Sequence, residues 1–547
     1  MLSNFKYIEF FVENAKQASY YYRSVFGFDG YAYSGPETGN SELVSYVLKQ
    51  NKQVIILVPE ISLTPQIVAK FIKRFGNKVA VLHSKLSQGE RYDQWKKIKN
   101  KEIPIVIGAR SAIFAPCDDL GLIIIDEEHE SSYKSEMNPK YYTIDVAKYL
   151  CRSSNGVLLL GSATPSIESY YSTEREEYKL LELKNRFNSN PLPGVEVVDM
   201  RVELEEGNKS MFSRRLYESM KKSLAAKQQV ILFLNRRGHS TFVSCRSCGY
   251  VLKCSNCDIS LTYHQRNNQA KCHYCGYKSI VPKICPECKS KYIKFFGTGT
   301  EKVEEYVNKL FPDFKTKRLD IDTTSKKGSL EKIIDSFGKR EIDILIGTQM
   351  VTKGLDFPYV TLVGVLSADI SLNLPDYRAN ERTFQLLTQV AGRAGRHEFN
   401  GNVVVQTYSP ENYAITASQR HDFSEFYKKE IQLRREFRYP PFYNIINIIV
   451  LGKEESSVVR SAKRLFEKIE SETLSNKDLK NIQLLGPNPA ILGRIKNFFR
   501  WQILLKYESV DHEIIKGIIN YICNINKSKY LESNVHLIFD LKPYNIF

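Results

Sequence analysis

Short apolar runs alternate with longer stretches of helical spacing from about residue 53 to residue 410. The runs are rich in Val, Ile and Leu, and they lie at residues 54–58, 105–107, 122–125, 157–160, 230–233, 344–346 and 403–405. Continuous apolar runs separated by helices are typical of parallel strands that are buried on both faces. The pattern therefore predicts an α/β fold built from parallel sheets.

Polar motifs directly follow several of these predicted strands. Pro59 comes after the first strand, Asp126 after the strand at residues 122–125, and Ser162 after the strand at residues 157–160. Ligands of open α/β sheets bind at the carboxyl ends of the strands. We therefore expect these motifs to share one rim.

The alternation breaks at two places and so divides the chain into domains. A cysteine-rich stretch at residues 243–290 interrupts the second α/β unit and reads as an insertion. After about residue 410, a basic helical segment at residues 423–438 leads to a Tyr439-Pro-Pro-Phe stop and mixed α and β patterns. We predict two lobes, residues 53–195 and 196–410, and a C-terminal domain at residues 411–547, with residues 1–52 standing apart.

The composition adds a strong positive charge. The 547 residues include 78 Lys and Arg against 61 Asp and Glu, a formal net charge of +17. A basic chain attracts polyanions, so nucleic acid is the first candidate partner. A Lys-rich solvated surface is the alternative, and charge alone does not choose between them.

Neither a membrane span nor a secretion signal is apparent in the sequence. The apolar stretches all fall short of the roughly 18 residues that a membrane span needs. The N-terminus also lacks the basic-then-apolar pattern of a signal peptide. We therefore expect a cytoplasmic protein.

Eight of the eleven cysteines form four Cys-x-x-Cys pairs. A two-residue spacer lets one turn present two thiolates to one ion, and four thiolates satisfy tetrahedral Zn²⁺. The pairs predict two structural zinc ions, because no ligand position is left open for water. Neighbouring and nested pairings both fit the loop lengths, and a disulfide-linked or metal-free cluster is the alternative. The pairs are Cys245/Cys248, Cys254/Cys257, Cys272/Cys275 and Cys285/Cys288.

The strand at residues 122–125 runs into a cluster of acids, Asp126-Glu127-Glu128, followed by His129. In nucleotide-hydrolysing proteins the first acid holds Mg²⁺ and the second orients the attacking water. The alternative is a strand whose acidic end merely faces solvent.

A second motif, Gln389-Val-Ala-Gly-Arg393-Ala-Gly-Arg396, places two arginines three residues apart. This spacing predicts that both lie on one face of a helix. Arginine is suited to stabilising charge on a transferring phosphoryl group. The alternative is that both arginines are solvated and that the small residues between them serve close helix packing. The polar motifs at residues 161–166 and 347–356 disfavour this alternative.

This ordered set of motifs resembles the superfamily 2 helicases and, among them, the PriA family. The resemblance covers about residues 53–547, and it implies two RecA-like lobes that bind ATP and Mg²⁺ and move 3′ to 5′ along DNA. It also implies a role in replication restart at stalled forks, with primosome proteins and single-stranded DNA-binding protein as partners. The motifs that carry it lie at residues 59–66, 83–84, 108–116, 126–129, 235–238, 297–301, 320–324, 354–357 and 376–382.

The resemblance also implies residue roles. Asp126 and Glu127, with Glu128 and His129, would serve Mg²⁺ and water, while Arg393 and Arg396 would reach the phosphates. Residues 162–164 would couple hydrolysis to movement, and the zinc sites would be nested, with the outer pairs on one ion and the inner pairs on the other. Further nucleotide contacts would fall on Gly354, Asp356 and Gln389, and DNA contacts on Thr64, Gln66, Arg110 and Thr348.

A mixture of cations and aromatic rings marks the C-terminal domain at Arg494-Ile-Lys-Asn-Phe-Phe-Arg500-Trp501. Such a mixture suits phosphate attraction and base stacking, and PriA proteins carry a similar stretch. A buried strand would explain Phe498 and Trp501 equally well. DNA contact is therefore predicted only for Arg494, Lys496 and Arg500.

The front of the chain departs from the helicase pattern. A phosphate-binding loop of the Gly-x-x-x-x-Gly-Lys-Thr type should precede the strand at residues 54–58, with its Lys on the β and γ phosphates. The chain contains no Gly-Lys-Ser or Gly-Lys-Thr, and the turn from Gly35 to Gly39 supplies glycines without a cation.

Residues 5–52 instead resemble the amino-terminal segment of 4-hydroxyphenylpyruvate dioxygenase. The likeness rests on residues 5–18, on Phe26-Gly-Phe, and on the stretch from Tyr33 to Lys52. In that family the catalytic iron ligands come from a later domain, so dioxygenase activity is not expected.

From this replacement we expect that the phosphate loop and the 3′-end-binding and winged-helix domains of PriA are missing. Without the loop we expect little or no ATP turnover. We also expect an exposed sheet edge where the first strand normally pairs, and hence poor solubility. The alternatives are a non-hydrolysing, zinc-containing DNA-binding or primosome scaffold, and a non-functional product of gene rearrangement.

Overall fold

The computed structural model describes most of the chain. The described residues are 7–12, 36–59, 65–84, 86–183, 192–234, 242–264, 269–295, 300–320, 323, 329–348, 357–394, 401–476, 479, 481–522, 527–544 and 546. They belong to two compact units: Met1–Pro193 with Thr352–Phe357, and Gly194–Val351 with Pro358–Phe547.

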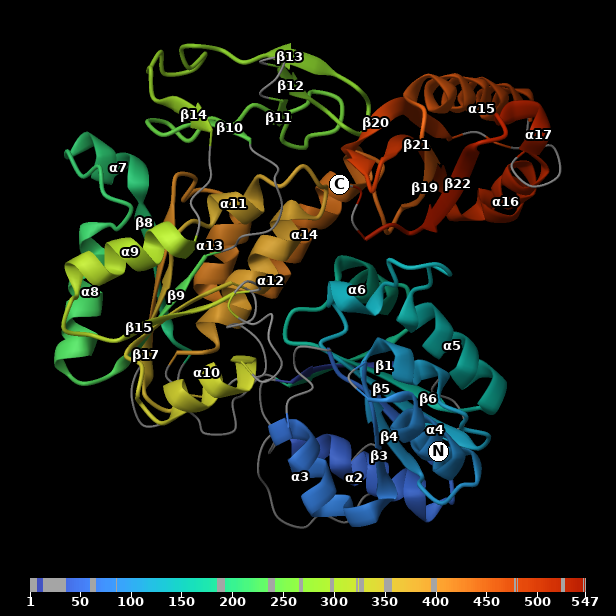
Figure 1. Cartoon of the computed structure of the whole chain (residues 1–547), viewed down its shortest axis with the longest axis horizontal. Coiled ribbons are helices and arrows are strands. Elements are labelled where there is room, and N and C mark those ends of the chain that lie inside the picture. Colours follow the sequence, from blue (N-terminus) through green and yellow to red (C-terminus); the bar gives the residue numbers. More distant parts are fainter. Residues whose placement is uncertain are drawn as a thin grey trace. The chain divides into compact units, whose positions relative to one another are not determined.

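The first unit is a parallel sheet of seven strands in the order β3-β4-β2-β5-β6-β1-β7. The strands are β1 (Tyr7–Val12), β2 (Gln53–Leu57), β3 (Val79–Leu82), β4 (Ile105–Gly108), β5 (Leu120–Asp126), β6 (Val157–Gly161) and β7 (Lys179–Leu183). Its helices are α2 (Pro36–Lys49), α3 (Pro65–Phe75), α4 (Gln88–Lys99), α5 (Thr143–Ser154) and α6 (Ile167–Glu174) (Figure 1).

Both faces of this sheet are buried. Within β2, Ile55 and Leu57 join one apolar cluster, while Val54 and Ile56 join a second cluster on the opposite face. Alternate residues of a strand point to opposite faces, so an unbroken apolar run is what two buried faces require. The prediction of buried parallel strands is confirmed for this unit.

The segment before β2 folds into the same unit. β1 pairs in parallel with β6 on one side and β7 on the other, and so covers the edge of β6 that we expected to be exposed. The expectation of an open edge is therefore wrong, because the apolar run Tyr-Ile-Glu-Phe-Phe-Val supplies a strand at that place. Leu43, Val44 and Val47 of α2 are buried against Val54 and Ile56.

The second unit begins with a parallel sheet of six strands in the order β15-β16-β9-β17-β18-β8. The strands are β8 (Gly194–Asp199), β9 (Gln229–Phe233), β15 (Thr316–Leu319), β16 (Ile344–Gly347), β17 (Val360–Val365) and β18 (Asn402–Thr407). Its helices are α7 (Met200–Glu205), α8 (Arg214–Ala225), α9 (Thr300–Leu310), α10 (Ser329–Gly338), α11 (Asp369–Leu372), α12 (Ala379–Ala391), α13 (Tyr413–Arg420) and α14 (Phe423–Glu436).

The cysteine-rich stretch is inserted between β9 and α9, as the sequence predicted. It contains a two-stranded antiparallel sheet of β10 (Val243–Cys245) and β14 (Ile293–Phe295). A second small antiparallel sheet joins β11 (Thr262–His264), β12 (Gln269–Lys271) and β13 (Lys278–Ile280) (Figure 1). We call residues 243–295 the zinc module.

The C-terminal part is an antiparallel sheet in the order β20-β21-β19-β22. Its strands are β19 (Tyr443–Gly452), β20 (Gln483–Ile495), β21 (Phe498–Glu508) and β22 (Val535–Leu541), and its helices are α15 (Glu455–Ser475), α16 (His512–Asn520) and α17 (Lys527–Tyr530). Val458 and Leu465 of α15 pack against Ile448 and Ile503 of the sheet. Among the described residues, no helix is long and apolar enough to cross a membrane.

Candidate functional site

The acidic cluster of the first unit lies at the carboxyl end of β5, where the sequence placed it. Asp126 and Glu127 are half-buried, whereas Glu128 and His129 are buried. Glu127 has a φ of 48°, a left-handed conformation that a non-glycine residue seldom adopts. The chain therefore turns sharply after the strand, and the four side chains do not share one environment.

Glu128 is held by the start of α6. Its carboxylate accepts hydrogen bonds from the Ser166 backbone N–H at 2.6 Å, the Ser166 hydroxyl at 3.2 Å and the Ser169 hydroxyl at 3.1 Å. Burial raises the pKa of Glu128, and these hydrogen bonds act in the opposite direction. Glu128 thus joins the end of β5 to the N-terminus of α6.

His129 makes a second link between the same two segments. Its Nδ1 lies 2.7 Å from the hydroxyl oxygen of Ser162, and that oxygen also accepts the Thr164 backbone N–H at 3.0 Å. The acidic cluster and residues 162–166 therefore form one hydrogen-bonded rim across the adjacent strands β5 and β6. A shift of either motif would be transmitted to the other.

Arg110 lies on this unit in a 3₁₀ helix that follows β4. Its guanidinium donates to the carbonyl oxygens of Ser132 at 3.1 Å and Lys134 at 2.6 Å, and it lies 5.9 Å from the ring centre of Tyr141. Arg110 therefore holds the loop that follows the acidic cluster. Thr64 and the side chain of Gln66, the other DNA candidates of this unit, lie outside the described residues.

In the second unit, α12 ends at Ala391, so Arg393 lies in the turn after the helix. The prediction that both arginines share a helical face is wrong for Arg393, because the glycines of the Ala-Gly-Arg-Ala-Gly-Arg run disfavour helix. Gln389 and Arg393 are half-buried, and Thr348 follows β16. Arg396, Gly354 and Asp356 lie outside the described residues.

The eight cysteines form two clusters within the zinc module. Cys245, Cys248, Cys285 and Cys288 make the outer cluster, and Cys254, Cys257, Cys272 and Cys275 make the inner cluster. This is the nested pairing that the family resemblance implied and that spacing alone left open.

The sulfur geometry fits zinc. The Sγ atoms of Cys245 and Cys288 are 3.6 Å apart, and those of Cys254 and Cys275 are 3.5 Å apart. Tetrahedral Zn²⁺ with bonds of about 2.3 Å requires sulfur separations of about 3.8 Å. Each cluster therefore presents four thiolates at the spacing of a closed structural zinc site.

The outer cluster is attached to the parallel-sheet part of the unit. Arg201 of α7 donates to the Cys248 carbonyl oxygen at 3.3 Å. Gly249, at φ 77°, lies so close to the Tyr408 carbonyl oxygen that a Cβ would come within 2.2 Å of it. Glycine is required there by both conformation and space.

The inner cluster is attached to the C-terminal part instead. The Tyr439 hydroxyl donates to the Cys257 carbonyl oxygen at 3.1 Å, and Gln502 of β21 donates to the His273 carbonyl oxygen at 2.8 Å. Asn488 of β20 donates to the Tyr274 carbonyl oxygen at 3.3 Å. The two clusters therefore fasten the zinc module to two different parts of the unit.

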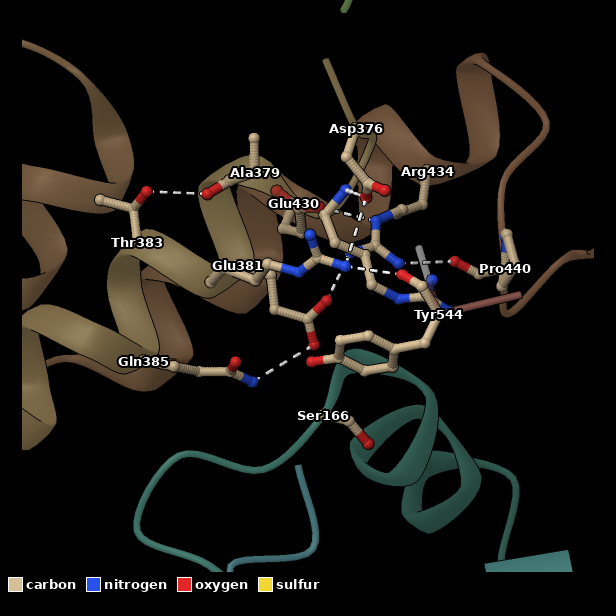
Figure 2. A network of polar contacts seen from close by, with 12 residues as sticks. Ser166, Asp376, Ala379, Glu381, Thr383, Gln385, Glu430, Arg434, Pro440 and Tyr544 are labelled. Carbon is tan, nitrogen blue, oxygen red and sulfur yellow. Dashed lines mark hydrogen bonds and ion pairs between the residues drawn. The ribbon is translucent and has the colours of Figure 1, made fainter. Parts of the chain in front are cut away.

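A buried ion network lies beside this attachment (Figure 2). Arg434 of α14 is 1% exposed, and its guanidinium lies 2.7 Å from a carboxylate oxygen of Glu381 and 2.6 Å from one of Glu430. It also donates to the Pro440 carbonyl oxygen at 3.0 Å and stacks over the Tyr377 ring. The sequence predicted a basic helix here but gave no sign that one of its arginines is buried.

The chain terminus completes the network. Arg378 donates to the Pro543 carbonyl oxygen at 3.1 Å, and Arg382 donates to the Tyr544 carbonyl oxygen at 2.6 Å. The motif at residues 376–382, singled out by resemblance to helicases, thus anchors the last residues of the chain to α12.

The candidate DNA contacts of the C-terminal part lie at the hairpin between β20 and β21. Lys496 and Asn497 both have positive φ, at 47° and 66°, as a two-residue hairpin turn of the type I′ class requires. Arg494 and Lys496 are exposed, and Arg494 lies over the Phe499 ring. Trp501 packs against the apolar core of this part, so its ring contributes to the stability of the fold.

Arg500, the third candidate of the hairpin, is half-buried. Its guanidinium donates to the Leu492 carbonyl oxygen at 3.4 Å, and burial lowers its pKa.

Four family models match the chain. A DEAD/DEAH box helicase model matches residues 41–172, and a helicase conserved C-terminal domain model matches residues 278–398. The PriA DNA helicase Cys-rich region matches residues 254–279, and the primosomal protein N C-terminal domain matches residues 435–544.

Curated relatives agree with these matches. The chain is 48% identical over 520 residues to the replication restart protein PriA of Bacillus subtilis (strain 168), covering 95% of this chain and 64% of that protein. It is 47% identical over 509 residues to that of Synechocystis sp., covering 91% and 60%. It is 40% identical over 491 residues to that of Treponema pallidum (strain Nichols), covering 89% and 73%. The chain therefore spans about two thirds of these relatives' length.

Proposed function

The chain belongs to the family of PriA replication restart proteins, and from that membership we propose that it acts on DNA as the body of an ATP-dependent 3′ to 5′ helicase with impaired ATP hydrolysis. The observation that carries the proposal is a contrast within the chain. The rim of acids and hydroxyls at the ends of β5 and β6 is intact, yet no Gly-Lys-Ser or Gly-Lys-Thr occurs in the sequence.

The residues of the rim divide into two roles. Asp126 and Glu127, half-exposed at the end of β5, would hold Mg²⁺ and orient water. Glu128 and His129 are buried in hydrogen bonds with Ser166 and Ser162, so we assign them to positioning. They would couple the acids to residues 162–164.

The remaining nucleotide contacts are assigned to the second unit. Arg393 and Arg396 would meet the phosphates, with Gly354, Asp356 and Gln389 as further contacts of the nucleotide.

The missing phosphate loop weakens the nucleotide site at its centre. Backbone amides and a Lys normally hold the β and γ phosphates in the geometry of reaction. Isolated acids and arginines supply charge but do not fix that geometry. We therefore assign the chain little or no ATP turnover.

Residues 5–52 resemble a 4-hydroxyphenylpyruvate dioxygenase, but the helicase model already matches from residue 41, so residues 41–52 belong to the helicase part. A dioxygenase origin is proposed only for the residues before that match. The contribution of residues 5–52 here is structural, because β1 and α2 complete the sheet and core of the first unit. No dioxygenase chemistry is assigned to them.

We assign two kinds of bound species to the chain, zinc ions and DNA. Two structural Zn²⁺ ions fit the inner and outer clusters. Forked or single-stranded DNA is proposed as the ligand, with Arg494, Lys496 and Arg500 facing its phosphates and Arg110 and Thr348 acting near it. Primosome proteins and single-stranded DNA-binding protein are proposed as partners through family membership.

The test is ATP hydrolysis by the purified chain with and without forked DNA, compared with Asp126→Asn as the matched control. We expect the parent rate to equal that of the variant in both conditions, because neither forms a competent site. A DNA-stimulated rate that Asp126→Asn abolishes would refute the impairment.

A further inference from the structure

A cavity of about 500 Å³ lies in the second unit between the zinc module and the parallel sheet. Its lining includes Met200, Leu234, Leu366 and Tyr408, which directly follow β8, β9, β17 and β18. Arg246, next to the outer-cluster ligand Cys245, closes it from the zinc module. The cavity thus sits at the carboxyl ends of four parallel strands, where ligands of open α/β sheets bind.

The positive charge of the cavity lining favours an anionic ligand. Among the described residues of that lining, Lys209 and Arg246 are the charged side chains and none is a carboxylate. A second cavity of the same unit, of about 380 Å³, is the opposite case. It is lined by five carboxylates, among them Asp258, Glu287 and Glu411, against Lys253 and Arg434. Of the two, the first cavity suits a phosphate and the second repels one.

The first cavity also offers a buried hydroxyl with unused hydrogen-bonding capacity. Ser367 is 8% exposed and lines the cavity, and its Oγ makes no hydrogen bond within the described part of the chain. Buried hydroxyls normally have a partner, since an unmet one costs free energy. A polar ligand group in the cavity would supply that partner.

Two tyrosines, Tyr306 and Tyr408, line the cavity. The hydroxyl of Tyr306 lies 3.0 Å from the Ser210 hydroxyl, and its ring packs 5.4 Å from that of Phe212. The backbone N–H of Tyr408 donates to the Asp369 carboxylate at 3.1 Å. Fixed aromatic faces beside cations are the combination that holds single-stranded nucleic acid, by stacking bases and neutralising phosphates.

We propose that this cavity takes one nucleotide of a single DNA strand, with its phosphate against Lys209 and Arg246 and its base beside Tyr306, Tyr408 and the apolar wall. The inference rests on the proposed DNA-binding function and adds a site to it. Because Arg246 belongs to the zinc module, the module would contact the strand at this cavity.

The experiment measures binding of a fluorescent oligothymidylate to the intact, zinc-loaded chain over a range of salt concentrations. Lys209→Gln removes the proposed phosphate contact at an exposed position that is not in the zinc module, and Ser367→Leu fills the cavity. The matched control is Lys253→Gln, which makes the same charge change in the second cavity. Zinc content and the unfolding midpoint of each variant show that it is folded.

We expect Lys209→Gln to lower the slope of log affinity against log salt by about 0.7, the contribution of one phosphate contact on a single strand, and to weaken binding several-fold. Ser367→Leu should weaken binding by about 5- to 150-fold, the range for loss of one stacked base. Lys253→Gln should bind like the parent. If Lys209→Gln and Ser367→Leu are folded and bind DNA as well as Lys253→Gln does, the cavity is not a DNA site, and the proposed DNA-binding function is unaffected. If the parent does not bind DNA, the proposed function fails first.

Two further arms identify the occupant. An abasic strand of equal length should bind more weakly than oligothymidylate, and equal binding would overturn the base pocket. Thymidine 5′-monophosphate should compete poorly. If it displaces the strand at low concentration from the parent but not from Lys209→Gln, the cavity belongs to a free nucleotide and the strand assignment is overturned.

Discussion

Arg434 shows how one residue can hold several parts of the fold. Its charge is removed from water and balanced by Glu381 and Glu430, which lie on α12 and α14. Removing one partner from a buried ion pair leaves uncompensated charge and costs about 3–5 kcal/mol. We predict that Arg434→Met lowers the free energy of unfolding by about that amount, as measured by urea denaturation.

The neighbouring Arg435 provides the control for this prediction. It lies on the same helix but is exposed. Arg435→Met should change the free energy of unfolding by less than about 1 kcal/mol. Equal effects of the two substitutions would show that the buried network contributes no more than the helix surface.

Asp369 gives a pH dependence whose sign can be worked out. Burial raises the pKa of this carboxyl to about 6, against hydrogen bonds from Tyr408 and Thr407. Because the pKa in the unfolded chain is about 4, the folded state binds the extra proton between about pH 4 and pH 6. Stability contributed by this group therefore falls as the pH rises through that window.

The measurement compares the parent with Asp369→Asn, which keeps the shape but does not titrate. Relative to the variant, the parent should lose up to about 3 kcal/mol of unfolding free energy between pH 4 and pH 6.5. Urea midpoints over this range report it. A difference between the two proteins that stays constant with pH would show that folding does not raise the pKa of Asp369.

Among the elements, α2 tests whether the residues directly before β2 are part of the fold. Leu43 is 4% exposed and packs with Val54 and Ile56 of β2. Truncating a buried Leu to Ala typically costs about 2–5 kcal/mol. We predict this loss for Leu43→Ala, whereas Lys49→Ala, at an exposed position of the same helix, should be nearly neutral. If both are neutral in thermal and urea unfolding, the segment is not packed on the sheet.

The two zinc clusters should have separable effects, because they are fastened to different parts of the unit. We predict two zinc ions per chain, and about one after Cys288→Ser in the outer cluster or Cys275→Ser in the inner cluster. Only the inner-cluster variant should speed proteolysis near residues 437–442, where Tyr439 meets Cys257. Equal cleavage of both variants would contradict separate anchoring.

The elements were the most predictable part of the molecule. Strands expected at residues 54–58 and 157–160 are found at Gln53–Leu57 and Val157–Gly161, because buried parallel strands need unbroken apolar runs. The nested zinc pairing followed from family resemblance, since either pairing satisfies the spacing. The helix expected to carry Arg393 ends before it, where glycine outweighs the spacing pattern.

Contacts between distant segments were not predictable from local pattern. The pairing of β1 with β6 and β7 joins residues about 150 to 170 positions apart in sequence. The run Tyr7–Val12 predicts a strand but does not indicate which strands it pairs with. The same holds for Arg434, whose burial depends on Glu381 from another helix. Such contacts depend on tertiary packing, which leaves no periodic signal in a single sequence.

At the scale of the whole molecule, we propose that DNA binding is independent of ATP turnover. The basic hairpin at Arg494 and Lys496 and the net charge of +17 both favour a polyanionic ligand. No Gly-Lys-Ser or Gly-Lys-Thr occurs in the sequence, and on this ground we propose that DNA binding is not linked to ATP hydrolysis. A chain of this kind should hold DNA in a way that nucleotide does not alter.

The most direct measurement is the affinity of the intact chain for forked DNA over a salt series, with and without Mg²⁺ and ATP. We predict binding whose logarithm falls linearly with log salt, with a slope of several units, and which ATP leaves unchanged. Affinity that is insensitive to salt, or that shifts when ATP is added, would contradict the account.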